Sequence, residues 1–66
     1  MQKPESVMVG QLWRLGGPGR EVQRVLDVAP LEFGDHWITM TWRSGRSRCG
    51  ALYMLDSDDW VYLGEA

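Results

Sequence analysis

The chain has 66 residues, 24% of them charged, and a formal net charge of −2 at neutral pH. This length allows one domain with a small core, expected to span residues 1–66. Cys49 is the only cysteine and His36 the only histidine, so an internal disulfide and a Cys/His zinc site are both excluded.

The N-terminal part of the chain predicts a loose end, a strand and a loop. Residues 1–6 are polar and are expected to be loose. Residues 7–15, VMVGQLWRL, are mostly apolar and predict a first strand. Residues 16–19, GGPG, hold the strongest chain breakers in the sequence, and this predicts a loop.

Residues 20–28, REVQRVLDV, fit two secondary structures. Apolar residues at helical spacing would give a helix over 20–29 and an α+β fold. Against the helix, the segment is rich in valine, and only Gly19 stands where an N-cap is needed. A strand with a bulge near Arg24 is therefore favoured, and the helix stays as the alternative.

A hairpin is the most clearly marked element of the chain. After a connecting loop over residues 29–35, residues 36–43, HWITMTWR, alternate and are rich in β-forming side chains, which predicts a strand. Ser44-Gly45 then predicts a two-residue turn, because glycine supplies the positive φ that such turns require. Residues 46–54 are expected to return as the next strand.

The C-terminal part completes an all-β outline. Residues 55–59, LDSDD, suit one short helical turn, because Asp and Ser side chains bond to nearby backbone groups. Residues 60–63, WVYL, predict a short last strand. The expected fold class is thus all-β, with five short strands and a helical turn before the last of them.

Several segments resemble a known group of proteins. VGQLWR, RVLDV and LYMLDSDDWVYL, with a glycine-rich loop and a hairpin between them, are similar to small uncharacterised bacterial and phage proteins with a Src-homology-3-like β-barrel. The resemblance covers roughly residues 8–64. It implies a small five-stranded barrel and a mobile-element origin, and it carries over no functional residue.

The predicted turn fixes which residues of the hairpin face one another. With Ser44-Gly45 as the loop, Arg43 is expected opposite Arg46, and Met40 opposite Cys49. Alternation then gives an inner face that forms the core and an outer face that meets solvent. The inner face is expected to carry Ile38, Met40, Trp42, Cys49, Ala51 and Tyr53, and the outer face Trp37, Thr39, Thr41, Arg43, Arg46, Arg48 and Gly50.

The candidate binding residues are those of the outer face that bind anions or stack: Arg43, Arg46, Arg48 and Trp37. Guanidinium groups hold carboxylates and phosphates in bidentate geometry. The net negative charge favours an acidic protein surface over nucleic acid, for which Trp37 would supply a stacking platform. The alternative is a solvated face that the chain's own carboxylates at 56–59 partly neutralise.

Other residue combinations predict no catalytic or metal site. His36 is expected ~13 Å from Cys49 along the ladder, too far for a nucleophile–base pair. The run DSDD at 56–59 lacks the length, glycine and closing glutamate of a calcium loop. Pro18 has no N–H to donate, so the glycine-rich loop is not expected to cradle phosphate. No cofactor and no metal are expected.

These observations predict a small, non-enzymatic, protein-binding accessory module. The resemblance adds a more concrete version, an inhibitor of a host protein encoded by a phage or mobile element. A nucleic-acid-binding module using the arginine-rich hairpin, and a small oligomeric enzyme with its site at a symmetry axis, stay open. Residues 1–12 show no leader pattern and no apolar run is long enough for a membrane span, so a cytoplasmic location without membrane contact is expected.

Overall fold

A computed structural model describes residues 2–43 and 45–65 of the chain. Its elements, in order, are β1 (Gln11–Leu15), β2 (Gln23–Pro30), a 3-10 turn (Glu32–Gly34), β3 (His36–Trp42), β4 (Gly45–Gly50), α1 (Ala51–Asp56) and β5 (Trp60–Glu65). All five strands belong to one antiparallel sheet in the order β4-β3-β2-β1-β5. The expected all-β class with one short helix before the last strand is confirmed.

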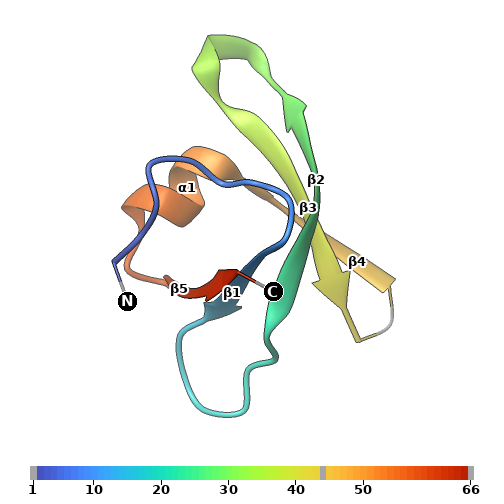
Figure 1. Ribbon diagram of the computed structural model, residues 1–66, viewed down its shortest axis with the longest axis vertical. Coiled ribbons are helices and arrows are strands. Elements are labelled where there is room, and N and C mark those ends of the chain that lie inside the picture. The colour runs from blue at the N-terminus through green and yellow to red at the C-terminus, as the bar shows by residue number, and fades with distance from the viewer. Residues whose placement is uncertain (1, 44, 66) are drawn as a thin grey trace.

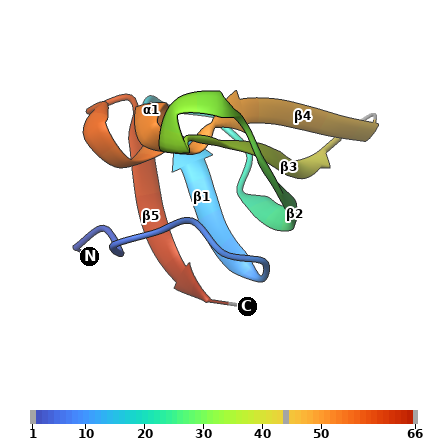
Figure 2. The same cartoon turned by 90° about the horizontal axis from the view of Figure 1, so that it is seen from above.

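The sheet folds over on itself without closing. β2, β3 and β4 form one half, and β1 and β5 form the other, joined through the short pairing of β1 with the start of β2 (Figure 1). From above, the β1–β5 ribbon runs across the direction of β4 (Figure 2). This strong twist between the halves encloses the core and leaves β4 and β5 as the two edge strands.

The ambiguous segment is a strand, as favoured, and the alternative helix over 20–29 does not form. Gln23 and Val25 point into the core, whereas Arg24 between them is exposed, so the burial has the two-residue period of a strand. The register of β2 against β3 shifts between Val25 and Asp27, which makes Leu26 the extra residue of a bulge.

The predicted register of the β3–β4 hairpin is wrong by two residues. Trp42 pairs with Gly45, Met40 with Ser47 and Ile38 with Cys49. The predicted turn Ser44-Gly45 includes Ser44, which lies outside the described residues, whereas Gly45 belongs to β4 with a φ of +145°. Because the shift is an even number, the side chains within β3 and β4 keep their predicted faces.

The bounds predicted around α1 are also wrong. Residues 51–54 are helical rather than part of a strand, and the helix ends at Asp56, before the predicted turn ends. Its N-terminus is capped by Asp35 from the loop before β3, whose carboxylate accepts from the Leu52 N–H at 3.0 Å. The apolar run ALYML suits a strand as well as a helix, and this contact from a distant segment favours the helix.

The core lies between the two halves of the sheet and under α1. Its buried apolar side chains are Val7, Trp13, Val25, Ile38, Met40, Ala51, Met54 and Trp60. Trp13 is fully buried, and its indole N–H donates to Gln11 Oε1 at 3.1 Å. Before β1, Lys3 donates from Nζ to the carbonyl of Met54 at 2.8 Å. Within the described part of the chain, no helix has the length and apolarity needed to cross a membrane.

Candidate functional site

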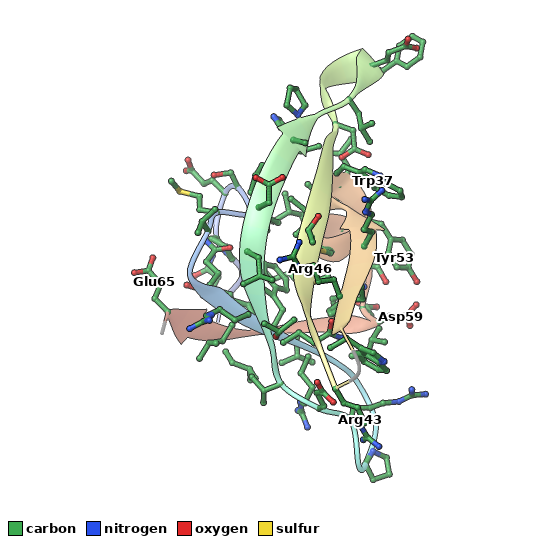
Figure 3. The ribbon with its side chains drawn as sticks, turned by 90° about the vertical axis from the view of Figure 1, so that its right-hand side faces the viewer. Trp37, Arg43, Arg46, Tyr53, Asp59 and Glu65 are labelled. Carbon is green, nitrogen blue, oxygen red and sulfur yellow. The ribbon has the colours of Figure 1, made fainter. Side chains whose placement is uncertain are left out.

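The outer face, as defined here, is the solvent side of β2, β3 and β4. Its side chains are Arg24, Asp27, Trp37, Thr39, Thr41, Arg46 and Arg48. Strand alternation places most of them together, and the bulge at Leu26 brings Asp27 to the same face. In the side view, Arg46 lies near the middle of this face and Trp37 toward one end (Figure 3).

Arg43, predicted as part of the arginine cluster opposite Arg46, lies apart from it. The residue follows β3, and its Nε lies 3.2 Å from Glu21 Oε1 in an ion pair. Arg46 instead faces Thr41 across the ladder. Figure 3 shows Arg43 at the tip of the molecule, away from Arg46. The structure therefore keeps Arg46, Arg48 and Trp37 on one face and removes Arg43 from it.

Arg46 and Arg48 line a hollow of about 460 Å³ on the outer face, together with Leu26, Asp27 and Thr39. Asp27 is the single carboxylate of this hollow. Among residues 2–43 and 45–65, the Arg43–Glu21 pair is the only ion pair, so neither arginine of the hollow is engaged by a carboxylate within 4.0 Å. The hollow therefore carries a positive excess that no internal partner neutralises.

Two tryptophans of β3 lie opposite glycines of β4. Trp37 pairs with Gly50 on the outer face, and Trp42 pairs with Gly45 on the inner face. Since glycine has no side chain, each indole stays partly open, and the exposed fractions are 39% for Trp37 and 37% for Trp42. Trp37 is thus exposed on the outer face as predicted, whereas Trp42 points inward but is not part of the buried core.

A second hollow, of about 320 Å³, lies on the inner side of β4. Its lining is mainly apolar: Leu15, Gln23, Trp42, Ser47, Arg48, Cys49, Tyr53 and Trp60. Ser47 donates to the buried Gln23 Oε1, which anchors β4 to β2. Burial raises the pKa of the Cys49 thiol, and the charge of Asp35 adds to the effect, so this cysteine is a neutral wall residue.

Tyr53 borders the same hollow from α1. Its hydroxyl donates to Asp59 Oδ2 (labelled with Tyr53 in Figure 3), and this bond raises the pKa of the phenol. The hydrogen bond holds the ring beside β4 with about half of its surface exposed. The inner hollow therefore combines three aromatic side chains with one thiol.

No catalytic pair forms from Cys49 and His36. Cys49 lines the inner hollow, whereas His36 lines a different one together with Ala51 and Leu52. Across the described segments, no three His, Cys, Asp or Glu side chains are grouped closely enough to hold a metal ion.

Sequence reasoning missed Arg24 and the second hollow, and it placed Tyr53 on the inner face but in a strand instead of a helix. Arg24 belongs to the outer face because β2 pairs with β3, and this pairing has no local sequence signal. Tyr53 was assigned to a strand, so its position beside β4 followed only from the helix. No protein-family model, no curated protein and no solved structure matches this chain.

Proposed function

We propose that this protein is a non-enzymatic binding module that holds an acidic segment of a partner protein on its outer face. The observation that carries the proposal is the hollow lined by Arg46 and Arg48, in which Asp27 is the single carboxylate. Guanidinium groups in a partly enclosed hollow are dehydrated at lower cost than ammonium groups and bind carboxylates in pairs of hydrogen bonds. Trp37, on the same face, adds apolar contact area.

A protein partner is favoured over nucleic acid by charge. The chain is net negative, and the four acidic residues after Cys49 have no basic residue among them. A phosphate backbone would meet this negative field at close range, whereas a short acidic segment needs only the local excess on the outer face.

The fold suits a binding role because it holds the binding residues on a stiff sheet. We infer that the fold is an open form of the small Src-homology-3-like barrel, because the strand order β4-β3-β2-β1-β5 and the helix before the last strand match that arrangement. A small twisted sheet of this kind presents β4 and its flanking side chains on a stiff support, which lowers the entropy lost on binding.

Charge reversal of the outer face tests the function. The immobilised protein is used to capture partners from nuclease-treated lysate of the source organism, with identification by mass spectrometry. Replacing both residues, Arg46→Glu and Arg48→Glu, should lower the recovery of specific partners about tenfold or more, because two favourable charge contacts become repulsive. The recovered partners should contain acidic segments.

The matched control is Arg20→Glu with Arg43→Glu, which changes the net charge equally. Arg20 precedes β2 and Arg43 follows β3, so neither residue belongs to the strands that form the outer face. This double variant should capture the same partners as the unmodified protein. Equal capture by both double variants would refute the outer face as the site. Capture that disappears on nuclease treatment would transfer the assignment to nucleic acid.

A further inference from the structure

Strand β4 is an edge of the sheet whose backbone is paired on one side only. The Val25 carbonyl points away from β3, because it accepts from the Gly10 N–H at 3.0 Å. Met40 is the partner of Val25 in the antiparallel ladder, so the backbone N–H and C=O of Met40 point the other way, toward β4. There Met40 pairs with Ser47. Alternation along β4 therefore directs the N–H and C=O groups of Arg46 and Arg48 to the free edge.

The two sides of this edge carry different chemistry. On the outer side, Arg46 and Arg48 line the basic hollow. On the inner side, Ser47 and Cys49 line the mainly apolar hollow with the rings of Trp42 and Tyr53, and Arg48 borders this hollow as well. Successive side chains of a strand placed beside β4 would enter the two hollows in turn. The edge thus selects a strand that alternates acidic and apolar residues.

The ends of β4 add apolar contacts to the same edge. Gly45 and Gly50 are the two terminal residues of the strand, and each leaves an indole of β3 partly open. An aromatic ring across from an edge glycine covers the backbone there and offers its remaining surface to a neighbouring strand. Trp42 and Trp37 therefore flank the free edge at its two ends, one on each face.

A second copy of the chain is a poor occupant of this edge. In an antiparallel β4–β4 pair, the arginines of one copy would lie on the same face as those of the other, and like charges on adjacent strands are unfavourable. The other edge strand, β5, has Glu65 as its single acidic residue. Natural proteins often protect free edges with charged side chains. Here Arg46 and Arg48 would attract an acidic strand and repel β4 of another copy.

We propose that β4 binds its partner by strand addition: an extended acidic–apolar peptide pairs antiparallel with the free edge, its carboxylates beside Arg46 and Arg48 and its apolar side chains in the inner hollow. The proposal deepens the proposed function and rests on it, since it names the conformation and sequence pattern of the acidic segment. Main-chain hydrogen bonds supply the affinity and the two hollows supply the selectivity.

The test uses synthetic peptides and fluorescence anisotropy at low salt. The probe is a labelled heptapeptide, Glu-Val-Glu-Val-Glu-Val-Glu, with blocked ends, and a peptide of the same composition with the residues in blocks is its control. Two further probes are N-methylated, one on the inner glutamates and one on valines. In antiparallel pairing, residues opposite Arg46 and Arg48 direct their own N–H groups to β4, so only the glutamate-methylated peptide loses ladder hydrogen bonds.

We expect the alternating peptide to bind, and the blocked-sequence and glutamate-methylated peptides to bind about tenfold more weakly or not at all. The valine-methylated peptide should bind within about threefold of the unmodified one. No binding of the alternating peptide, or equal affinity of the two methylated peptides, would overturn strand addition. The affinity for the peptide could also fall at higher protein concentration because the protein self-associates. This result would assign the edge to a second copy and would also overturn strand addition.

These outcomes separate the two proposals. One outcome is that both methylated peptides bind the unmodified protein equally well and that neither binds the double variant Arg46→Glu with Arg48→Glu. This outcome would refute strand addition but keep the outer face as a site for acidic segments. Partner capture that does not depend on either arginine would remove the proposed function, and strand addition would fall with it.

Discussion

Phe33 combines an unfavourable backbone conformation with a side chain that is almost fully exposed to solvent. It stands in the 3-10 turn between β2 and β3 with a φ of +60°, the left-handed region that costs a residue with a side chain about 1 kcal/mol or more. Its side chain is 97% exposed, so no burial offsets that cost. Asparagine enters the same region several times more readily than most residues.

Replacing Phe33 with Asn should therefore stabilise the protein. The substitution relieves backbone strain and removes no buried surface, so we expect the free energy of unfolding to rise by roughly 0.5–1 kcal/mol. Urea denaturation followed by tryptophan fluorescence measures the change. Leu31→Asn, in the same loop but with φ of −115°, should bring no gain. A loss of stability from Phe33→Asn would show that the ring makes a contact that stabilises the fold.

At the scale of elements, α1 depends on a carboxylate from outside the helix. Gly50 precedes the helix and has no side chain to cap it. Asp35 replaces that cap by accepting from the N–H groups of Leu52 and His36, which lowers the pKa of its carboxyl below the ordinary value of 3.8. A Cβ at position 50 would lie 3.1 Å from Asp35 Oδ2, so the glycine is needed for this close approach rather than for its φ.

The lowered pKa of Asp35 predicts a pH dependence of stability. Because the folded-state pKa lies below the unfolded one, the ionised carboxylate stabilises the fold above about pH 4, and this contribution is lost as the pH falls through the folded-state pKa. Between about pH 5 and pH 2, the unmodified protein should lose more stability than Asp35→Asn. Thermal unfolding monitored by circular dichroism measures the two profiles.

The control for this pH dependence is Asp58→Asn, which removes a carboxylate from the exposed turn after α1. Its profile should follow that of the unmodified protein. Parallel profiles for all three proteins would contradict the role of Asp35 as the cap of α1.

At the scale of the whole molecule, Trp13 belongs to the core that the two halves of the sheet share. It is fully buried on β1, with its ring 5.2 Å from that of Tyr62 on β5. Its indole N–H donates to the buried Gln11, which also accepts from the Met8 N–H and donates to the Ser6 carbonyl. The β1–β2 pairing between the halves is short, so the shared core, which holds Trp13 of β1 together with Val25 of β2 and Met40 of β3, carries much of the connection.

Trp13→Phe should therefore destabilise the whole domain rather than one half. The smaller ring leaves a cavity and removes one donor from Gln11, and together these cost about 2 kcal/mol. Far-ultraviolet circular dichroism and tryptophan fluorescence should report the same lowered midpoint in urea. Trp37→Phe, on the exposed outer face, should change stability by no more than about 0.5 kcal/mol. Separate midpoints for the two signals would show that the halves unfold independently.

The sequence predicts what depends on alternation and misses what depends on contacts between distant segments. The shared face of Trp37, Arg46 and Arg48 follows from a two-residue period. The valines and the poor N-cap of residues 20–28 favour a strand, and β2 is indeed a strand, although it begins and ends later, at Gln23 and Pro30. The start of α1 depends on Asp35, which lies far from it in the sequence. The ion pair that draws Arg43 away from Arg46 comes from Glu21 in another loop, and no local pattern reveals it.

The bulge at Leu26 has a consequence for how this chain can change in evolution. Val25 faces the core and pairs with Met40, but Asp27 pairs with the outward Thr39, because the extra residue restarts the alternation. A gene copy that lost this single codon would leave Val25, Asp27 and Val28 opposite Met40, Thr39 and Ile38, so the bulge would disappear while each side chain kept its face. Selection is therefore expected to accept the loss of residue 26 more readily than a single-residue deletion in β3, which has no extra residue to give up and whose side chains would change faces.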